Sequence, residues 1–384
     1  MENQKCPEVR FKKFDRLWDS KLIEDILKIK SGMSQKNVEV EKGIYPILAT
    51  GGEIGRTNTA LYDKESVLIG RKGTIDKPYY MNSPFWTVDT LFYSELSSEV
   101  VGYFVYSIFQ KINWRHHNTS TGVPSLTSSA IHAIEINIPD KTEQGQIGNF
   151  FQNLDESIAL HEKKLAQTQN FKKAMLEKMF PKQGSKRPEI RLKGFSGDWE
   201  KKKLENEVEF FSGLTYSPND ITDKNGTLVL RSSNVHDNQI VTENNVYVDN
   251  EAINVQNVEV GDIIVVVRNG SRNLIGKHAV INEKMENTVI GAFMTGVKAS
   301  NPYFINALFD TNLFDVAVSR NLGATINQIT TAMFKEMEFS FPNEDEQIAL
   351  GQFFQKIDET CLLLKQQLQT LKNLKQALLE KMFV

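Results

Sequence analysis

Basic side chains interleaved with amides and aromatic rings are the residues of this chain that could bind a nucleic acid. Arginine can donate two hydrogen bonds to guanine, asparagine can pair in the same way with adenine, and lysine neutralises phosphate. We take twelve such residues, in two separate stretches, as candidate DNA contacts: Arg71, Lys72, Lys77, Trp114, Arg115 and His116, then Arg231, Arg268, Asn269, Arg272, Lys277 and Arg320. Each alone is a weak indication, because loops of this composition are commonly just solvated.

The elements that must position these residues come in two copies, because the chain repeats itself. Residues 7–14, which begin Pro-Glu-Val-Arg, return as residues 188–195, and Trp18 returns as Trp199, both at an offset of 181. Near the other end of each copy, Leu-Glu-Lys-Met-Phe occurs at residues 176–180 and again at 379–383, at an offset of 203. The second copy is therefore longer by 203 − 181 = 22 residues. This pattern predicts two lobes with similar frames and divergent inserts.

Short β-like runs lie in the divergent middles. Residues 67–69, 134–138 and 263–267 are rich in Val, Leu and Ile and are bounded by Gly, Asn and Pro, which predicts strands. We align residues 71–74 (Arg-Lys-Gly-Thr) with residues 268–271 (Arg-Asn-Gly-Ser), at an offset of 197. A glycine segment around Gly323 precedes the last strand of the second copy.

A long proline-free segment closes each copy. These segments run from Glu143 to Phe180 and from Glu346 to Phe383, and most of their residues favour helix. Before each stands a proline followed by a residue that can cap a helix, Asp140 in one copy and Asn343 in the other. We therefore expect two helices of equal length.

Apolar residues recur in both segments with the 4,3,4,3 spacing of a heptad seam. The first seam includes Ile147, Phe151 and Leu154, and the second includes their equivalents. Two such seams predict that the helices pack on each other, and the alternative is that each helix packs on its own lobe. Lys172 and Lys375 interrupt the seams at equivalent positions, and we expect them to help fix the register.

The duplication also tests partial enzyme motifs. A nuclease-like set could be drawn from Asp140, Glu162 and Lys164, but the second copy has Asn, Lys and Gln at the equivalent positions. The chain has no Walker lysine and no dinucleotide-binding fingerprint. Its neighbouring histidines His116 and His117 have no other ligand at metal-binding spacing, which favours a surface loop. We expect no catalytic residue, cofactor or metal site.

Composition is that of an ordinary globular protein, with 40% hydrophobic and 24% charged residues. The chain has no apolar run long enough for a membrane span, no secretory signal and only two cysteines, which predicts a cytoplasmic location. Its net charge is −3, with 26 basic and 22 acidic residues in 1–187 against 19 and 26 in 188–384. DNA binding must therefore rest on local basic patches or on a basic partner.

Together these features resemble the DNA-sequence-specificity subunit of type I restriction–modification systems. The resemblance rests on the paired Pro-Glu-Val/Ile-Arg starts, the Pro-x(3)-Glu-Gln helix openings and the Leu-Glu-Lys-Met-Phe endings, and it covers essentially the whole chain. It implies an α+β fold with two pseudo-twofold-related target-recognition domains joined by two long antiparallel coiled-coil helices. The implied boundaries are 1–141 for the first recognition domain, 142–180 for the central helix, 181–187 for a linker, 188–344 for the second domain and 345–384 for the distal helix.

The resemblance also implies partners. Each lobe would read one half of a bipartite, asymmetric site in double-stranded DNA, and the helix pair would set the gap between the halves. The helices would dock two modification (methyltransferase) subunits, and restriction (motor/nuclease) subunits would complete the complex. Methyl donor and ATP would be bound by these partners, so this chain would be non-catalytic, with no cofactor and no membrane contact. The alternative is a coiled-coil scaffold that binds proteins, whose binding would depend little on salt.

Overall fold

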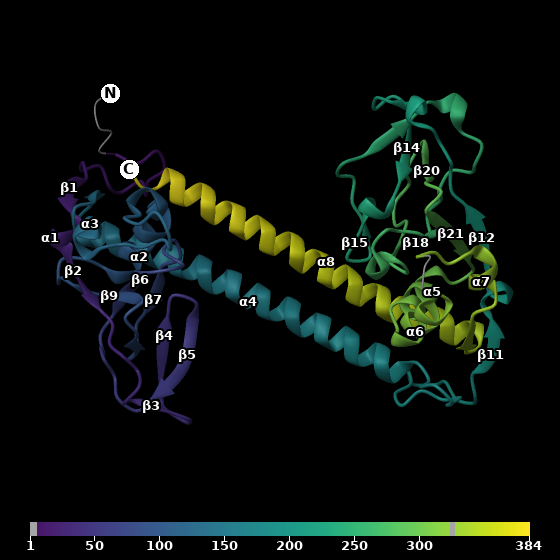
Figure 1. The fold of residues 1–384 in the computed structure, drawn as a ribbon, viewed down its shortest axis with the longest axis horizontal. Coiled ribbons are helices and arrows are strands. Elements are labelled where there is room, and N and C mark those ends of the chain that lie inside the picture. Colours follow the sequence, from purple (N-terminus) through teal and green to yellow (C-terminus); the bar gives the residue numbers. More distant parts are fainter. Residues whose placement is uncertain (1–5, 323–326) are drawn as a thin grey trace. The chain divides into compact units, whose positions relative to one another are not determined.

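The structure is a computed structural model that describes residues 6–322 and 327–384, so the predicted segment around Gly323 lies outside the described residues. The chain divides into two compact units. Unit 1 comprises Met1–Lys163 with Lys365–Val384, and unit 2 comprises Lys164–Leu364. Each unit holds a lobe of mixed helix and sheet, the first part of one long helix and the last part of the other (Figure 1). The predicted α+β fold with two repeated units is confirmed.

The lobe of unit 1 contains two small sheets. One is antiparallel, in the order β2 (Leu27–Ser31), β9 (Leu91–Leu96), β6 (Ser66–Gly70) and β7 (Tyr79–Met81). The other has the order β3 (Glu39–Val40), β5 (Gly52–Thr57), β4 (Tyr45–Ala49) and β8 (Trp86–Thr87). A separate pair joins β1 (Asp19–Leu22) to β10 (Glu135–Ile138). The short helices are α1 (Ile23–Ile26), α2 (Gly102–Lys111), α3 (Ser128–His132) and the 3₁₀ turn η1 (Trp114–His117).

The lobe of unit 2 repeats this plan. Its antiparallel sheet has the order β12 (Val208–Ser212), β21 (Met294–Ala299), β18 (Ile263–Val266) and β19 (His278–Val280). The second sheet has the order β13 (Ile221–Thr222), β17 (Val246–Val248), β14 (Thr227–Leu230) and β20 (Thr288–Ile290). Two further pairs are β11 (Glu200–Lys203) with β22 (Glu338–Phe341), and β15 (Val235–His236) with β16 (Gln239–Ile240). The helices are α5 (Pro302–Phe309), α6 (Asn312–Asn321) and α7 (Thr331–Lys335), with 3₁₀ turns η2 (Leu204–Asn206), η3 (Pro218–Asp220), η4 (Ser232–Asn234), η5 (Asn250–Ala252) and η6 (Arg272–Leu274).

Strand register shows how the two copies correspond and corrects one alignment. Gly70 of β6 lies opposite Leu91, and Val266 of β18 lies opposite Met294. The next residues, Arg71 and Val267, both donate a backbone N–H to the carbonyl of the facing turn. Arg71 therefore corresponds to Val267, and Lys72 to Arg268, at an offset of 196. The alignment at 197 was wrong by one residue, and in a strand such a slip exchanges the two faces.

The two long helices are α4 (Lys141–Met179) and α8 (Glu344–Lys381). Both predicted N-caps are confirmed. The carboxylate of Asp140 accepts the backbone N–H groups of Thr142 and Glu143 at 2.9 and 3.1 Å, and the side-chain oxygen of Asn343 accepts that of Glu346 at 2.9 Å. Each cap satisfies helix donors that have no partner within the helix. No helix of the described residues is long and apolar enough to cross a membrane.

Within each unit the parts of α4 and α8 run antiparallel, and the same kind of ion pair joins them in both units. Lys375 Nζ lies 2.5 Å from the carboxylate of Asp155 in unit 1, and Lys172 Nζ lies 2.5 Å from that of Asp358 in unit 2. The two aspartates, like the two lysines, are equivalent at the offset of 203. Each lysine that interrupts a seam is thus paired with an aspartate of the other helix, and its role in fixing the register stays a prediction.

The closing motif of each helix is buried in a lobe. Phe383, at the end of α8, packs on Trp18, Phe104 and Phe151 in unit 1, with ring centroids 5.5–6.2 Å apart. Phe180, at the end of α4, packs in the same way against the equivalent rings of unit 2, Trp199, Phe304 and Phe354. Both seam interpretations therefore hold in part. The outer turns pack into lobes, and the central turns pack on the other helix.

Candidate nucleic-acid interface

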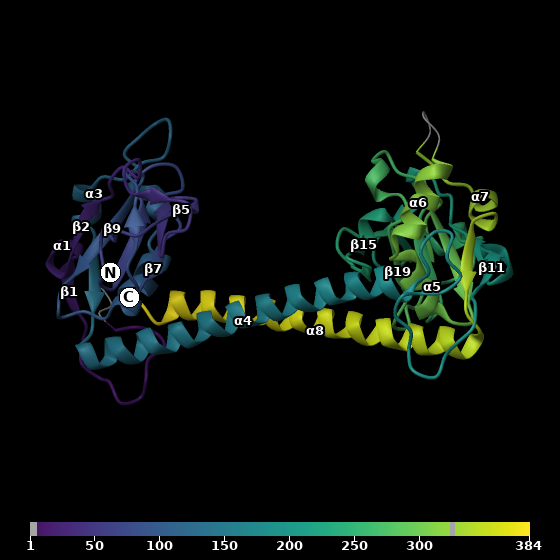
Figure 2. The same ribbon diagram turned by 90° about the horizontal axis from the view of Figure 1, so that it is seen from below.

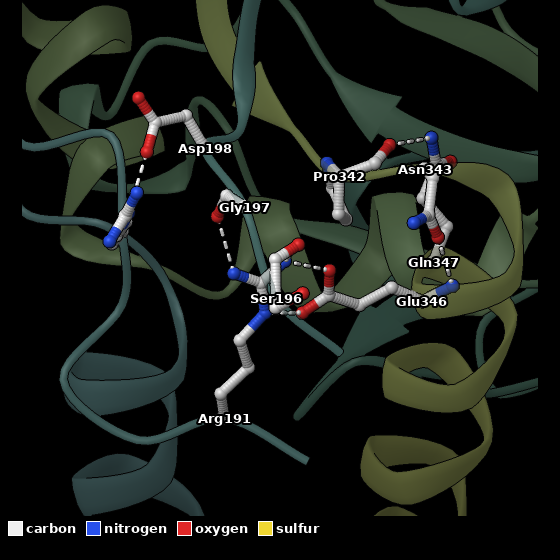
Figure 3. Close-up of polar contacts among 9 residues, drawn as sticks. Arg191, Ser196, Gly197, Asp198, Pro342, Asn343, Glu346 and Gln347 are labelled. Carbon is white, nitrogen blue, oxygen red and sulfur yellow. Dashed lines mark hydrogen bonds and ion pairs between the residues drawn. The ribbon is translucent and has the colours of Figure 1, made fainter. Parts of the chain in front are cut away.

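Each lobe is fastened to the start of its long helix by a buried ion pair. In unit 2 the guanidinium of Arg191 contacts both carboxylate oxygens of Glu346, at 2.8 and 2.6 Å, and also donates to the carbonyls of Ser196 and Gly197 (Figure 3). In unit 1 Arg10 binds Glu143 in the same two-pronged way, at 2.7 Å for each contact. The hydrogen bond that Arg10 donates to the Glu143 carboxylate raises the pKa of Arg10 above its ordinary value. The recurring Arg and Glu of the repeat motifs are therefore partners.

The glutamine that follows each glutamate holds the lobe from a second side. Gln347 donates to the carbonyl of Pro342 (Figure 3). It also accepts from the side chain of Asn301. Gln144 donates to Pro139 and accepts from the backbone N–H of Val101, directly before α2. These buried amides fix the short helix of each lobe against the long helix. The lobe and the start of its helix thus form a rigid support for the loops.

In unit 1 the structure brings the candidate contacts together on two adjoining loops, residues 71–78 and 113–125. The backbone N–H of Gly73 donates to the carbonyl of Pro124 at 2.9 Å, and Lys72 forms a β-bridge with Ser125. Lys72, Lys77, Arg115 and His116 are exposed on these loops. We call these two loops loop surface 1. In Figure 2 the long helix α4 passes along the other end of the lobe from α3.

Two residues of loop surface 1 already have protein partners. Arg115 binds the carboxylate of Asp76 at 2.8 Å, and this hydrogen bond lowers the pKa of Asp76. The Arg115 side chain is 78% exposed and that of Asp76 is 33% exposed, so a phosphate could replace the carboxylate at little cost. Arg71 is half-buried and donates to the carbonyl of Asp89 at 3.1 Å. Its side chain helps to hold the turn before β9.

Trp114 requires a correction. Its side chain is 1% exposed, its ring packs on Phe109, and its indole N–H donates to the Phe109 carbonyl at 2.7 Å. A ring buried in this way cannot reach a base edge without unfolding the loop. Trp114 therefore anchors the loop that presents Arg115 and His116. Sequence alone could not separate the two roles, because an aromatic ring among basic residues suits either a base or a core.

In unit 2 the candidates lie on the loop between β18 and β19 and around it. Asn269 donates from its side chain to the hydroxyl of Ser232 at 2.9 Å, and Asn327 donates to the carbonyl of Gly270 at 3.2 Å. Arg268 and Arg272 are exposed on this loop, and Lys277 is half-buried where it ends. Residues 231–232, 268–277, 291–293 and 327–328 form loop surface 2. Arg231 belongs to it but is half-buried, and its guanidinium donates to the carbonyl of Asn244.

Arg320 and Phe293 are two further exposed residues of the lobe of unit 2. Arg320 is exposed near the end of α6, and the described contacts do not tie it to loop surface 2. Phe293 was missed by the sequence analysis, although its side chain is 52% exposed and the guanidinium carbon of Arg268 lies 4.9 Å from its ring centroid. The available signal was an aromatic residue in a Gly-Ala-Phe turn between two aliphatic runs.

A buried ionic cluster lies where the lobe of unit 2 meets α4. Asp310 contacts Lys172 Nζ at 2.7 Å, lies 3.4 Å from the His278 imidazole and accepts from Asn238 at the tip of the β15–β16 hairpin. Burial disfavours ionisation of Asp310, but His278 and Lys172 outweigh it and hold the pKa of Asp310 at about 2. In unit 1 Asp155, the equivalent of Asp358, pairs with Lys375 and also accepts from the hydroxyl of Tyr103 at 2.8 Å.

Two lobes of one fold, each clamped to a long helix and each carrying a different loop surface, define a duplicated recognition protein. The family model described as type I restriction modification DNA specificity domain matches residues 16–170 and again residues 196–373. The chain belongs to this family and contains two copies of its domain. The family resemblance seen in the sequence is confirmed.

Individual relatives agree with this assignment. The chain is 23% identical over 294 residues to the type I restriction enzyme MjaVIII specificity subunit of Methanocaldococcus jannaschii, which covers 72% of this chain and 68% of that protein. Its fold is similar to the crystal structure of the S subunit of the type I restriction–modification system from M. genitalium, with a TM-score of 0.75, 15% identity and 99% of both chains covered. A chain from a structure on complex assembly and conformational transition of the type I system is similar at a TM-score of 0.50 and 12% identity, over 95% of this chain and 97% of the other.

Proposed function

We propose that this chain is a non-catalytic subunit that reads a bipartite, asymmetric site in double-stranded DNA. Loop surface 1 reads one half of the site and loop surface 2 reads the other. In this proposal residues 1–141 and 188–344 are the target-recognition domains, 142–180 and 345–384 are the helices that set the gap, and 181–187 is a linker. The family assignment supports the proposal, and the loop surfaces supply its chemistry.

A basic residue placed identically in the two lobes is the observation that carries the proposal. Lys72 and Arg268 each directly follow the residue whose N–H closes the turn beside the central strand, and each forms a β-bridge with a late loop, at Ser125 and Gln328. Around this shared position the loops differ in sequence and length. A basic residue at the same position of both lobes, surrounded by different neighbours, suits two lobes that read different base sequences.

The long helices carry exposed apolar residues that suit a protein partner. Leu160 and Phe171 of α4 are 49% and 48% exposed, and their equivalents Leu363 and Leu374 of α8 are 54% and 46% exposed. Each unit contains one residue from each helix. Large exposed apolar side chains favour association, and a repeated set favours two copies of one partner. We take these four residues as the docking sites of two modification subunits, with restriction subunits completing the complex.

The test is to co-express the full chain with its cognate modification subunit and to map methylated bases across the host genome. We expect one non-palindromic motif made of two specified halves and an unspecified gap. Replacing residues 188–344 by the same lobe of another family member should change one half of the motif only. A purified complex should also lose DNA affinity steeply as salt rises, because each neutralised phosphate releases counterions.

Three kinds of outcome would contradict the proposal. A palindromic motif, or changes in both halves after replacement of one lobe, would mean that the lobes do not read separately. DNA binding with no sequence preference and little salt dependence would favour a protein-binding scaffold. Methyl transfer by the chain without its partner would contradict the non-catalytic role.

A further inference from the structure

An exposed aromatic ring stands at the centre of loop surface 2. Phe293 is 52% exposed, and the guanidinium of Arg268 lies over its ring, 4.9 Å from the centroid. Leaving a large apolar ring half in water forgoes part of its burial energy. Arginine is well suited to stack on such a ring because its guanidinium is planar and weakly hydrated. The arrangement restricts a side chain that would otherwise sample many rotamers.

The turn that carries Phe293 is rigid. The backbone N–H groups of Val267 and Arg268 both donate to the Phe293 carbonyl, at 3.0 and 3.2 Å, and the N–H of Ala292 donates to Leu214 at 2.9 Å. Close packing locks the turn further, since a Cβ on Gly213 would lie 2.1 Å from the carbonyl oxygen of Gly291. Ring and guanidinium are therefore presented from fixed backbone, as a precise contact requires.

The neighbours of Arg268 differ from those of basic residues in unit 1. Arg115 of loop surface 1 contacts a carboxylate, whereas Arg268 contacts a ring and forms no ion pair within residues 6–322 and 327–384. Beside it, Asn269 is held by Ser232. The residues of unit 1 equivalent to Arg268 and Phe293 are Lys72 and Thr90, at offsets of 196 and 203. The stacked pair is thus particular to unit 2.

We propose that Phe293 is a specificity-determining residue that holds Arg268 for bidentate recognition of one guanine in the half-site of unit 2. This inference rests on the proposed function. The guanidinium would donate two parallel hydrogen bonds to O6 and N7 of guanine in the major groove. The ring keeps the guanidinium plane fixed. Unlike a carboxylate, it carries no negative charge that would compete with guanine for the arginine. Unit 1 has a lysine at this position, which lacks the planar two-pronged donor of an arginine, and a threonine in place of the ring.

The experiment uses the full chain in complex with its cognate modification subunit and its mapped DNA site. Affinity is measured for that site and for variants in which each base pair is replaced in turn. We expect Arg268→Lys to reduce discrimination at one G·C pair of the unit 2 half by roughly 5- to 150-fold. Phe293→Leu should reduce discrimination at the same pair by roughly 2- to 5-fold, and Phe293→Tyr, which keeps the ring, should restore it.

Lys284→Ala is the matched control, because it removes an exposed charge of the same unit that pairs with Glu286. It should leave discrimination unchanged at every position. The inference is overturned if the unit 2 half contains no G·C pair, if the Phe293 and Arg268 variants affect different pairs, or if both discriminate as the wild type does. Each of these leaves the proposed function intact. A wild-type complex without sequence preference would remove both proposals.

Discussion

At the scale of single residues, the repeated motifs are explained by contacts between their members. The arginine of the opening motif and the glutamate of the helix start occur together because they form one ion pair, in which the side chain of Glu346 is 1% exposed. Both groups are removed from water, so each depends on the other to offset its desolvation. Removing one partner leaves a buried charge, which is far more costly than losing a surface pair.

We therefore expect Glu346→Ala to destabilise the chain by roughly 3–5 kcal/mol, because the guanidinium of Arg191 would remain buried without its carboxylate. Urea denaturation of the full chain measures this change. The matched control is Glu189→Ala, which removes an exposed partner of Lys182 and should leave stability nearly unchanged. Equal effects of the two substitutions would show that the clamp adds nothing beyond a surface pair.

At the scale of elements, each long helix has three kinds of turn with different tasks. The first turns carry the N-cap and the clamped glutamate, the central turns pair with the other helix, and the last turns enter a lobe through Phe180 or Phe383. The central turns are the least buried, since Ile158, Leu165 and Leu368 are all partly exposed. Length can therefore change there with little effect on the lobe cores, since only Leu165 of these three residues packs against one.

Deleting one heptad from each helix, residues 161–167 of α4 and 364–370 of α8, spares the four exposed apolar residues and should change the gap in the recognised DNA while leaving both half-sites as they were. A heptad shortens a helix by about 10 Å, and removing it from both keeps the seams and the Lys–Asp pairs in register. Binding to DNA sites with a series of gap lengths measures the change. Altered half-sites with an unaltered gap would contradict the role of the helices as a spacer.

At the scale of the whole molecule, a duplicated frame allows one kind of partner to be bound twice. The exposed apolar residues of the helices repeat at the offset of 203, whereas the loop surfaces do not repeat. The repeated helix residues therefore suit two identical protein partners. The two loop surfaces, which differ, suit two different DNA half-sites. The negative charge of residues 188–384 also fits a chain whose phosphate contacts are supplied in part by those partners.

Leu160→Glu should leave one modification subunit bound, and Leu160→Glu with Leu363→Glu should leave none, because each substitution places a charge within an apolar contact. The mass of the purified complex measures the number of bound subunits. Gln169→Glu adds the same charge at another exposed position of α4 and should leave two subunits bound. Loss of both subunits after the single Leu160 substitution would indicate one shared docking site.

Patterns local in the sequence predicted much of this protein. The duplication, the aliphatic strands, the long helices with their caps at Asp140 and Asn343, and the family all follow from short motifs and periodicities. Caps and heptads depend on residues only a few positions apart, and the duplication shows as short motifs that occur twice, so each can be recognised without the fold. The contents of the loop surfaces were predicted in part, because basic residues usually stay at the surface.

Only the tertiary structure decided which residues meet and which are buried. Trp114 lies in the core, Lys72 rather than Arg71 corresponds to Arg268, and Phe293 is exposed beside an arginine 25 positions before it. Burial and register depend on contacts between segments far apart in the chain, which composition and spacing do not specify. The sequence by itself determined that there are two similar frames and which elements build them. The tertiary structure decided which side chains of each lobe are exposed and which are buried, because burial depends on how distant segments pack together.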